Sequence, residues 1–231
     1  IDSFTHKIIK NFAYDLDLPL NFEVELDSDS LLNQAVEILI SKIGSDKELT
    51  NLLINYSLDK IDDDKSWDIT NDLNDFAKVL LKEDDIPHFK NLSKNSLEDF
   101  INLKKKLIIE EQELKSSFKK VGERFLKILE ENNLEFNDFN RGSIPKFFSD
   151  IATKSFDFSF TTRSETIAKA IESHQYYKKA TTKDVASTIE NIVPVIIDSF
   201  QKSKTLYGKY LLNNLILKNI IPLAVLNLSL I

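Results

Sequence analysis

Residues 96–131 decide the fold, and they read SLEDFINLKKKLIIEEQELKSSFKKVGERFLKILEE. The apolar residues at 107, 114, 118, 121, 125 and 128 have the heptad spacing of a helix that packs along one stripe. A helix of this length would span roughly 50 Å at 1.5 Å per residue. We therefore expect a long helix that forms an arm or a helical hairpin, ended by Asn132-Asn133.

The rest of the chain also repeats apolar residues at helical spacing, so the predicted fold class is all-α. Pro87 is expected to end one helical unit, and Phe156 to Phe160 is expected to be a short strand or an extended loop. Asn21 to Leu26 alternates for only a few residues. We expect a single helical domain over 1–231. Helices are predicted at 3–16, 30–43 with Ser30 as cap, 46–56 with Asp46 as cap, 67–81, a short stretch after Pro145, 164–177, 182–204 with a kink at Pro194, and 206–219.

Composition limits the class of protein. The 231 residues are 42% apolar and include 16 Phe, which is enough to build a packed core. The net charge is −7, but residues 1–100 carry 10 Lys/Arg against 22 Asp/Glu, whereas residues 101–231 carry 20 against 15. Such asymmetry is typical either of a basic face for a polyanion or of an unevenly charged solvated surface.

The residues needed for several kinds of catalysis are missing. The four Gly residues lie at least 20 positions apart, so no Gly-rich phosphate loop such as Walker A is possible. There is no Cys, and the three His residues have no second ligand at metal-binding spacing. We therefore expect no catalytic site, no metal site and no cofactor within this chain.

The ends of the chain carry no targeting signal. No basic stretch followed by an apolar one opens the sequence. Residues 211–231 are apolar but contain four Asn, one Lys and one Pro, and this composition is too polar for a lipid span. We expect a cytoplasmic location without membrane contact. Because the first residue is Ile1, we also expect the chain to be a piece of a longer protein.

The first residues, Ile1-Asp2-Ser3-Phe4, open a helical stretch. They resemble the Thr-Ile-Asp/His-Ser-Phe motif of UvrD/Rep-type superfamily 1 DNA helicases, especially the RecB/AddA-like members of the Bacteroidetes type. Further stretches are similar to the same family in the same order: 18–27, 65–67, 134–139 and 211–226. The resemblance covers essentially the whole chain.

The resemblance implies a helical accessory domain, domain 1B, that guides DNA beside an ATP-driven motor. In that family, residues 1–18 would form the opening helix, and residues 205–231 would lead back toward the motor. ATP, Mg²⁺ and the Walker motifs would belong to the parent helicase. The expected partners are a single-strand/duplex DNA junction and the motor, with a nuclease domain or a second helicase-nuclease subunit left open. Asp2, Ser3 and Phe4 match the motif that lines the single-strand path. Ser3 could hydrogen-bond a phosphate or cap its helix, and Phe4 is expected in the core rather than stacked on a base.

Basic residues indicate further contacts with DNA phosphates. Lys120, Arg124 and Lys127 are spaced 4 and 3, so they share one helix face, unless neighbouring Glu residues simply balance them. Tyr176, Tyr177, Lys178 and Lys179, with Arg163 nearby, could stack a base and hold its phosphate. Alternatively, the two Tyr side chains close a helix onto the core. Arg141 lies in a turn, Asn140 to Ser143, that could meet a duplex backbone.

A different class of function also fits. The long heptad-patterned helix could bind a partner protein or pair with itself, and its stripe would then be exposed in the monomer.

Overall fold

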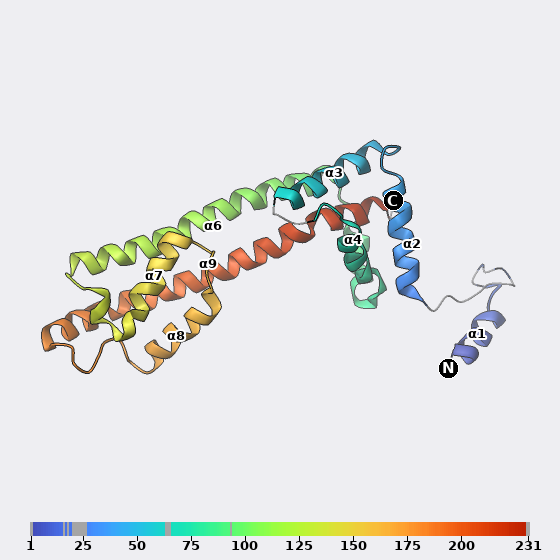
Figure 1. The fold of residues 1–231 in the computed structure, drawn as a ribbon. Coiled ribbons are helices and arrows are strands. Elements are labelled where there is room, and N and C mark those ends of the chain that lie inside the picture. The colour runs from blue at the N-terminus through green and yellow to red at the C-terminus, as the bar shows by residue number, and fades with distance from the viewer. Residues whose placement is uncertain are drawn as a thin grey trace. The chain divides into compact units, whose positions relative to one another are not determined.

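The computed structural model describes residues 2–15, 17, 19, 27–62, 66–92 and 94–229. Within these residues the structure is helical, and the β-structure consists of two isolated bridges (Figure 1). The prediction of an all-α fold is therefore confirmed. Contacts divide the chain into two compact units: unit 1 comprises 1–95 and 221–231, and unit 2 comprises 96–220. The prediction of one domain stays a prediction, because one domain can contain two such units.

Unit 1 is built from short helices around a small apolar core. Its α2 begins earlier than predicted, because the carboxylate of Asp27 rather than the hydroxyl of Ser30 caps it: Asp27 Oδ1 accepts from the Ser30 backbone N–H at 3.0 Å. Asp46 caps α3 as predicted and accepts from the Leu49 N–H at 3.0 Å. The helices are α1 Asp2–Asn11, α2 Ser28–Ser41, α3 Lys47–Asp62, α4 Thr70–Ala77, η1 Lys78–Leu81, η2 Glu83–Asp85 and α5 Ile86–Leu92.

The predicted stop at Pro87 is wrong, because Pro87 lies in the first turn of α5. A proline is tolerated there, since the amide N–H that it lacks would have no partner within the helix. The alternating segment Asn21 to Leu26 lies outside the described residues.

Unit 2 is organised by two long helices, α6 Leu97–Glu131 and the first part of α9 Lys183–Ser229. They run alongside each other in opposite directions (Figure 1), and Asn213 of α9 donates to the Leu107 carbonyl of α6 at 3.1 Å. Ser96 and Asp99 form a capping box at the start of α6. The remaining elements are η3 Phe136–Asp138, η4 Asn140–Gly142, α7 Ser143–Lys154 and α8 Phe160–Glu172.

The heptad stripe of α6 is buried inside unit 2. Phe118 and Phe125 are completely buried, and the Phe125 ring lies 4.0 Å from that of Phe148 on α7. The segment Phe156–Phe160 is a turn leading into α8 rather than a strand; its Phe156 ring stacks on Phe118 at 4.2 Å and on Tyr210 at 3.9 Å. The stripe is thus covered within the chain, and it is not available to a partner protein.

The helices predicted at 182–204 and 206–219 form one continuous helix, α9. Pro194 lies inside it and removes one backbone hydrogen bond. The helix continues because Ile192 and Ile196, on either side of the proline, are both buried in the core of unit 2.

One helix among the described residues is long and apolar enough to cross a membrane by length and composition. It is the Lys183–Leu228 part of α9, with a mean hydropathy of 1.5 in a window that is 39% buried. Its Asn213 and Asn227 are buried, and Asn227 donates to the Asn95 carbonyl at 2.9 Å. This helix is a weak membrane candidate only, since a core helix passes the same test; a cytoplasmic location stays a prediction.

Candidate nucleic-acid interface

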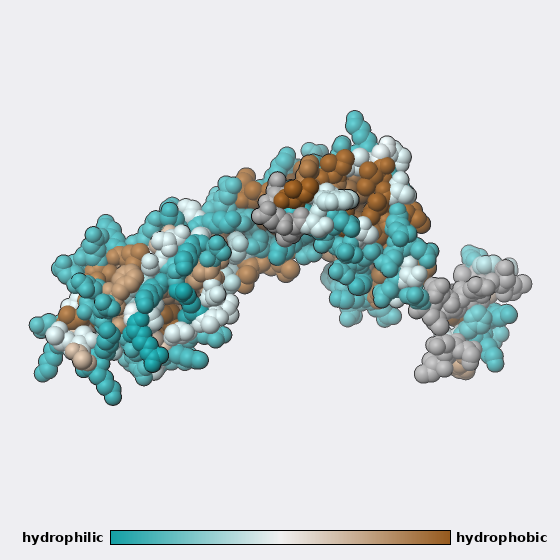
Figure 2. All heavy atoms as spheres, in the orientation of Figure 1, coloured by the Kyte–Doolittle hydropathy of each residue, from teal (hydrophilic) through white to brown (hydrophobic). Residues whose placement is uncertain are grey.

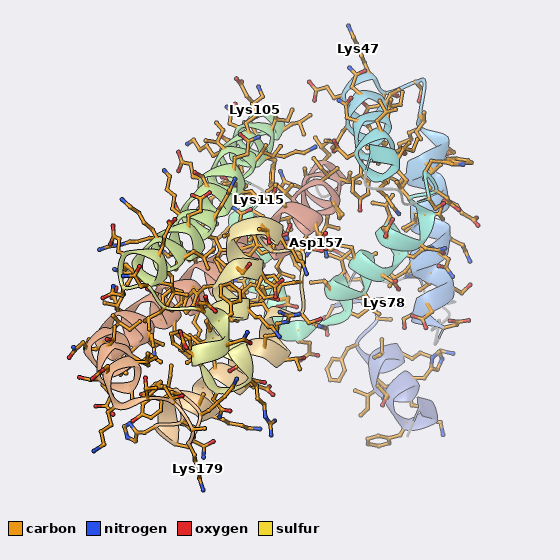
Figure 3. The ribbon with its side chains drawn as sticks, turned by 60° about the vertical axis from the view of Figure 1, so that its left-hand side comes forward. Lys47, Lys78, Lys105, Lys115, Asp157 and Lys179 are labelled. Atoms are coloured by element: carbon orange, nitrogen blue, oxygen red, sulfur yellow. The ribbon has the colours of Figure 1, made fainter. Side chains whose placement is uncertain are left out.

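Two loops that are far apart in sequence meet at one end of unit 2. The backbone N–H of Asn140 donates to the Tyr176 carbonyl at 2.9 Å, and Phe139 and Tyr177 form an antiparallel bridge. The turn that carries Arg141 is thereby held beside the loop that carries Lys178 and Lys179, which are both exposed. Figure 3 shows Lys179 extending into solvent. The structure therefore brings together two of the predicted basic segments.

The Arg141 turn is a tight turn with two left-handed residues. Arg141 has φ 54° and ψ 13°, and Gly142 has φ 61° and ψ 19°, which are the angles of a type I′ turn. Ser143 Oγ donates to the Asn140 carbonyl at 3.0 Å and supports the turn. A left-handed conformation costs a residue such as Arg about 1–2 kcal/mol. The turn directs an exposed guanidinium group toward solvent at this end of unit 2.

Tyr176 is not part of the predicted stacking platform, whereas stacking on Tyr177 stays a prediction. Tyr176 is 4% exposed in the core, and burial raises the pKa of its hydroxyl. The Tyr177 hydroxyl donates to Glu190 Oε1 at 2.6 Å, and this hydrogen bond raises its pKa. The alternative interpretation, that the tyrosines close the chain onto the core, is confirmed for Tyr176. Base stacking on Tyr176 is excluded because its ring is inaccessible.

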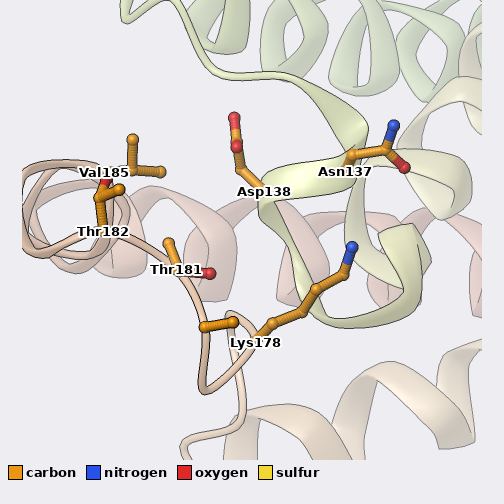
Figure 4. Close-up of a pocket in the computed structure, with 7 residues that line it drawn as sticks. Asn137, Asp138, Lys178, Thr181, Thr182 and Val185 are labelled. Carbon is orange, nitrogen blue, oxygen red and sulfur yellow. The ribbon is translucent and has the colours of Figure 1, made fainter.

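A pocket of about 270 Å³ lies where the two loops meet (Figure 4). Lys178 extends along it toward Asn137, and Thr181 and Thr182 lie on the side where α9 begins. Asp138 also lines the pocket, and its carboxylate accepts from the Glu135 N–H at 2.7 Å. No local sequence pattern indicates this pocket, because its walls come from segments about 40 positions apart. The lining residues are Asn137, Asp138, Lys178, Ala180, Thr181, Thr182 and Val185.

The predicted basic face of α6 is exposed near the same end of unit 2. Lys127 forms an ion pair with Glu131 at 3.6 Å, one helical turn later. Within the described part of the chain, Lys120 and Arg124 have no ion-pair partner, although the neighbouring Lys119 pairs with a Glu. Glu131 therefore balances the charge of Lys127, whereas the charges of Lys120 and Arg124 remain available on this face.

Arg163 has a structural role rather than a free guanidinium group. Its Nη1 forms an ion pair with Asp150, whose other carboxylate oxygen lies 2.9 Å from Lys154 Nζ. Its guanidinium also lies 5.9 Å from the centre of the Phe158 ring. Arg163 thus links α8 to the buried carboxylate of α7. The prediction of Arg163 as a DNA contact overlooked this partner, 13 positions earlier in the sequence.

The motif residues Asp2, Ser3 and Phe4 begin α1 in unit 1. The side chains of Asp2 and Ser3 lie outside the described part of the structure. Phe4 is 67% exposed, so the prediction that it lies in the core is wrong. Ile8, one helical turn later in α1, is exposed as well, and so is Phe12 just after the end of this helix.

We refer to Lys120, Arg124, Lys127, Arg141, Lys178 and Lys179 as the basic end of unit 2. In the described part of the chain, no three His, Asp or Glu side chains gather in a way that could hold a metal ion. No family model, curated protein or solved structure matches the chain. The functional argument therefore rests on the residues of the basic end and their geometry.

Proposed function

We propose that this chain is a DNA-guiding accessory domain, of the domain 1B type, in an ATP-dependent UvrD/Rep-like DNA helicase of the RecB/AddA kind. The sequence resemblance suggests the family. The observation that carries the proposal is the Asn140–Tyr176 hydrogen bond, because it joins two basic loops at one end of unit 2. ATP and Mg²⁺ would be bound by motor parts of the parent protein, in the cytoplasm, and whether a nuclease subunit joins them is left open.

The chemistry of the basic end favours contact with the phosphate backbone. Lys178, Lys179 and Arg141 are exposed cations on loops, which can neutralise phosphates and release condensed counterions. The buried Tyr176 ring cannot stack on single-stranded bases, and the neighbouring Tyr177 ring is half-buried and packs against the core. We therefore expect binding that is independent of sequence and stronger on duplex or forked DNA than on single strands.

The test is fluorescence anisotropy with single-stranded, blunt-duplex and forked DNA, each over a salt series. The wild-type chain should bind forked or duplex DNA, and the logarithm of its affinity should fall linearly with the logarithm of the salt concentration. The double variant Lys178→Glu/Lys179→Glu should bind at least about 10-fold more weakly, with a salt slope smaller by about 2.

The matched control is Lys209→Glu/Lys218→Glu, which changes the net charge equally on exposed residues of α9. Its affinity and slope should remain close to wild type. Equal losses in both variants would show that only total charge matters, and the basic end would then not be the binding site. An unchanged salt slope in Lys178→Glu/Lys179→Glu would remove these two lysines from the site.

A further inference from the structure

Arg141 has a backbone conformation that is costly for an arginine. Its φ of 54° lies in the left-handed region, where glycine is the usual residue and asparagine is tolerated. Three other described residues with a positive φ, namely Asn133, Ser155 and His174, lie at the C-terminal ends of α-helices, where such a conformation is common. Arg141 ends no α-helix, so helix termination does not account for its strain.

Nothing in the described part of the chain uses the guanidinium group of Arg141. The residue is exposed, and within residues 94–229 its side chain forms no hydrogen bond or ion pair. The central positions of a type I′ turn favour Asn or Asp followed by Gly, so asparagine would build the same turn with less strain. Backbone strain of this kind is found most often at functional sites. The guanidinium group is therefore available for a contact outside the chain.

The turn presents Arg141 as a single side chain at its tip. Gly142 is buried and Asn140 is half-buried, so the residues before and after Arg141 lie against unit 2. A Cβ atom added to Gly142 would lie 3.1 Å from the Phe136 carbonyl oxygen, which shows how closely the turn packs on η3. One exposed side chain on a turn held in this way fits a narrow groove better than a flat surface.

Cations stand beside both neighbours of Arg141. The Lys146 side chain lies next to Gly142, with its Cε atom 3.6 Å from the position of an added Cβ atom. On the other side, the backbone hydrogen bond described above holds the loop of Lys178 and Lys179. Most of the surface visible at this end of unit 2, on the left of Figure 2, is hydrophilic. The minor groove of duplex DNA matches this pattern, because it is a narrow channel of negative potential with a phosphate strand along each edge.

We propose that Arg141 enters the minor groove of duplex DNA and senses its width, while the neighbouring lysines contact the phosphates along its edges. The inference rests on the proposed function and deepens it by naming the part of the duplex that is bound. A·T tracts have a narrow minor groove with a stronger negative potential, so they should hold the guanidinium group more tightly. The phosphate contacts stay independent of sequence, and the groove contact adds a dependence on groove width.

Three duplexes of equal length and charge, compared by fluorescence anisotropy, test the groove contact. One carries a central A·T tract, one carries G·C pairs, and one carries inosine·cytosine pairs, which lack the guanine amino group of the minor groove but keep the major-groove pattern of G·C. The wild-type chain should bind the A·T and inosine duplexes at least about 5-fold more tightly than the G·C duplex. Equal affinity for all three would overturn this inference alone, whereas a lack of saturable binding to any duplex would overturn the proposed function with it.

Two substitutions separate a groove contact from a phosphate contact. Arg141→Gln removes the charge and should abolish the preference among the duplexes. The control Lys209→Gln neutralises an exposed residue of α9 outside the basic end, and it should keep the preference. Arg141→Lys keeps the charge, but its ammonium group is more strongly hydrated than a guanidinium group and should lose most of the preference. An unchanged preference in either Arg141 variant would overturn the proposal.

Arg141→Asn tests the link between backbone strain and binding. Asparagine tolerates the left-handed conformation, so this variant should raise Tm by roughly 2–4 °C and at the same time lose the groove preference. Thermal denaturation followed by circular dichroism measures the first effect, and anisotropy with the same three duplexes measures the second. A lower Tm would show that the Arg141 side chain is needed within the chain, and the proposal would then be wrong.

Discussion

Replacing Gly122 by alanine should separate α6 from α7. The added Cβ atom would lie 2.5 Å from the Phe148 carbonyl oxygen and 2.6 Å from the Ala152 nitrogen, whereas an ordinary contact is 3.4–4 Å. These are backbone atoms, so α7 must move by almost 1 Å and disturb the Phe125–Phe148 ring contact. Overpacking of this kind costs about 1–3 kcal/mol and exceeds the ~1 kcal/mol that alanine contributes as a better helix former.

Urea and thermal denaturation of Gly122→Ala, followed by circular dichroism, measure this cost. A net loss of up to about 2 kcal/mol should lower Tm by up to roughly 8 °C. The control is Gly208→Ala, where an added Cβ atom meets nothing within 4 Å; it should raise stability by about 0.5–1 kcal/mol. If Gly122→Ala were as stable as Gly208→Ala, α6 and α7 would not approach each other as described.

Three further variants test particular interactions. Asp150→Asn removes the partner of Arg163 and Lys154 and should cost about 1–3 kcal/mol in urea denaturation, while DNA affinity stays unchanged; a loss of affinity would return Arg163 to the DNA site. Asp46→Ala removes the cap of α3 and should cost about 1 kcal/mol, measured in the same way. Burial raises the pKa of Tyr56 to about 12, so the unfolded chain ionises first and this tyrosine lowers stability as the pH rises from about 10 to about 12. In Tyr56→Phe the urea midpoint should fall less over this pH range than it does in the wild-type chain. Identical pH profiles of the urea midpoint in the two proteins would contradict the raised pKa of Tyr56.

The parts of the fold that local rules govern were predictable from sequence. The heptad spacing between Ser96 and Glu131 placed α6 to within one residue of its observed start, and its last residue agrees. Asp46 as the cap of α3 follows the same kind of rule. At α2, however, Asp27 and Ser30 are both good caps three positions apart, and only the observed hydrogen bond selects Asp27.

The candidate site depends on contacts that the sequence does not encode locally. The spacing of Lys120, Arg124 and Lys127 correctly placed them on one exposed helix face. By contrast, the burial of Tyr176 depends on packing in unit 2, and its carbonyl meets Asn140 only because the chain folds back between them. An aromatic residue beside two lysines has the same local pattern whether its ring lies in the core or on the surface.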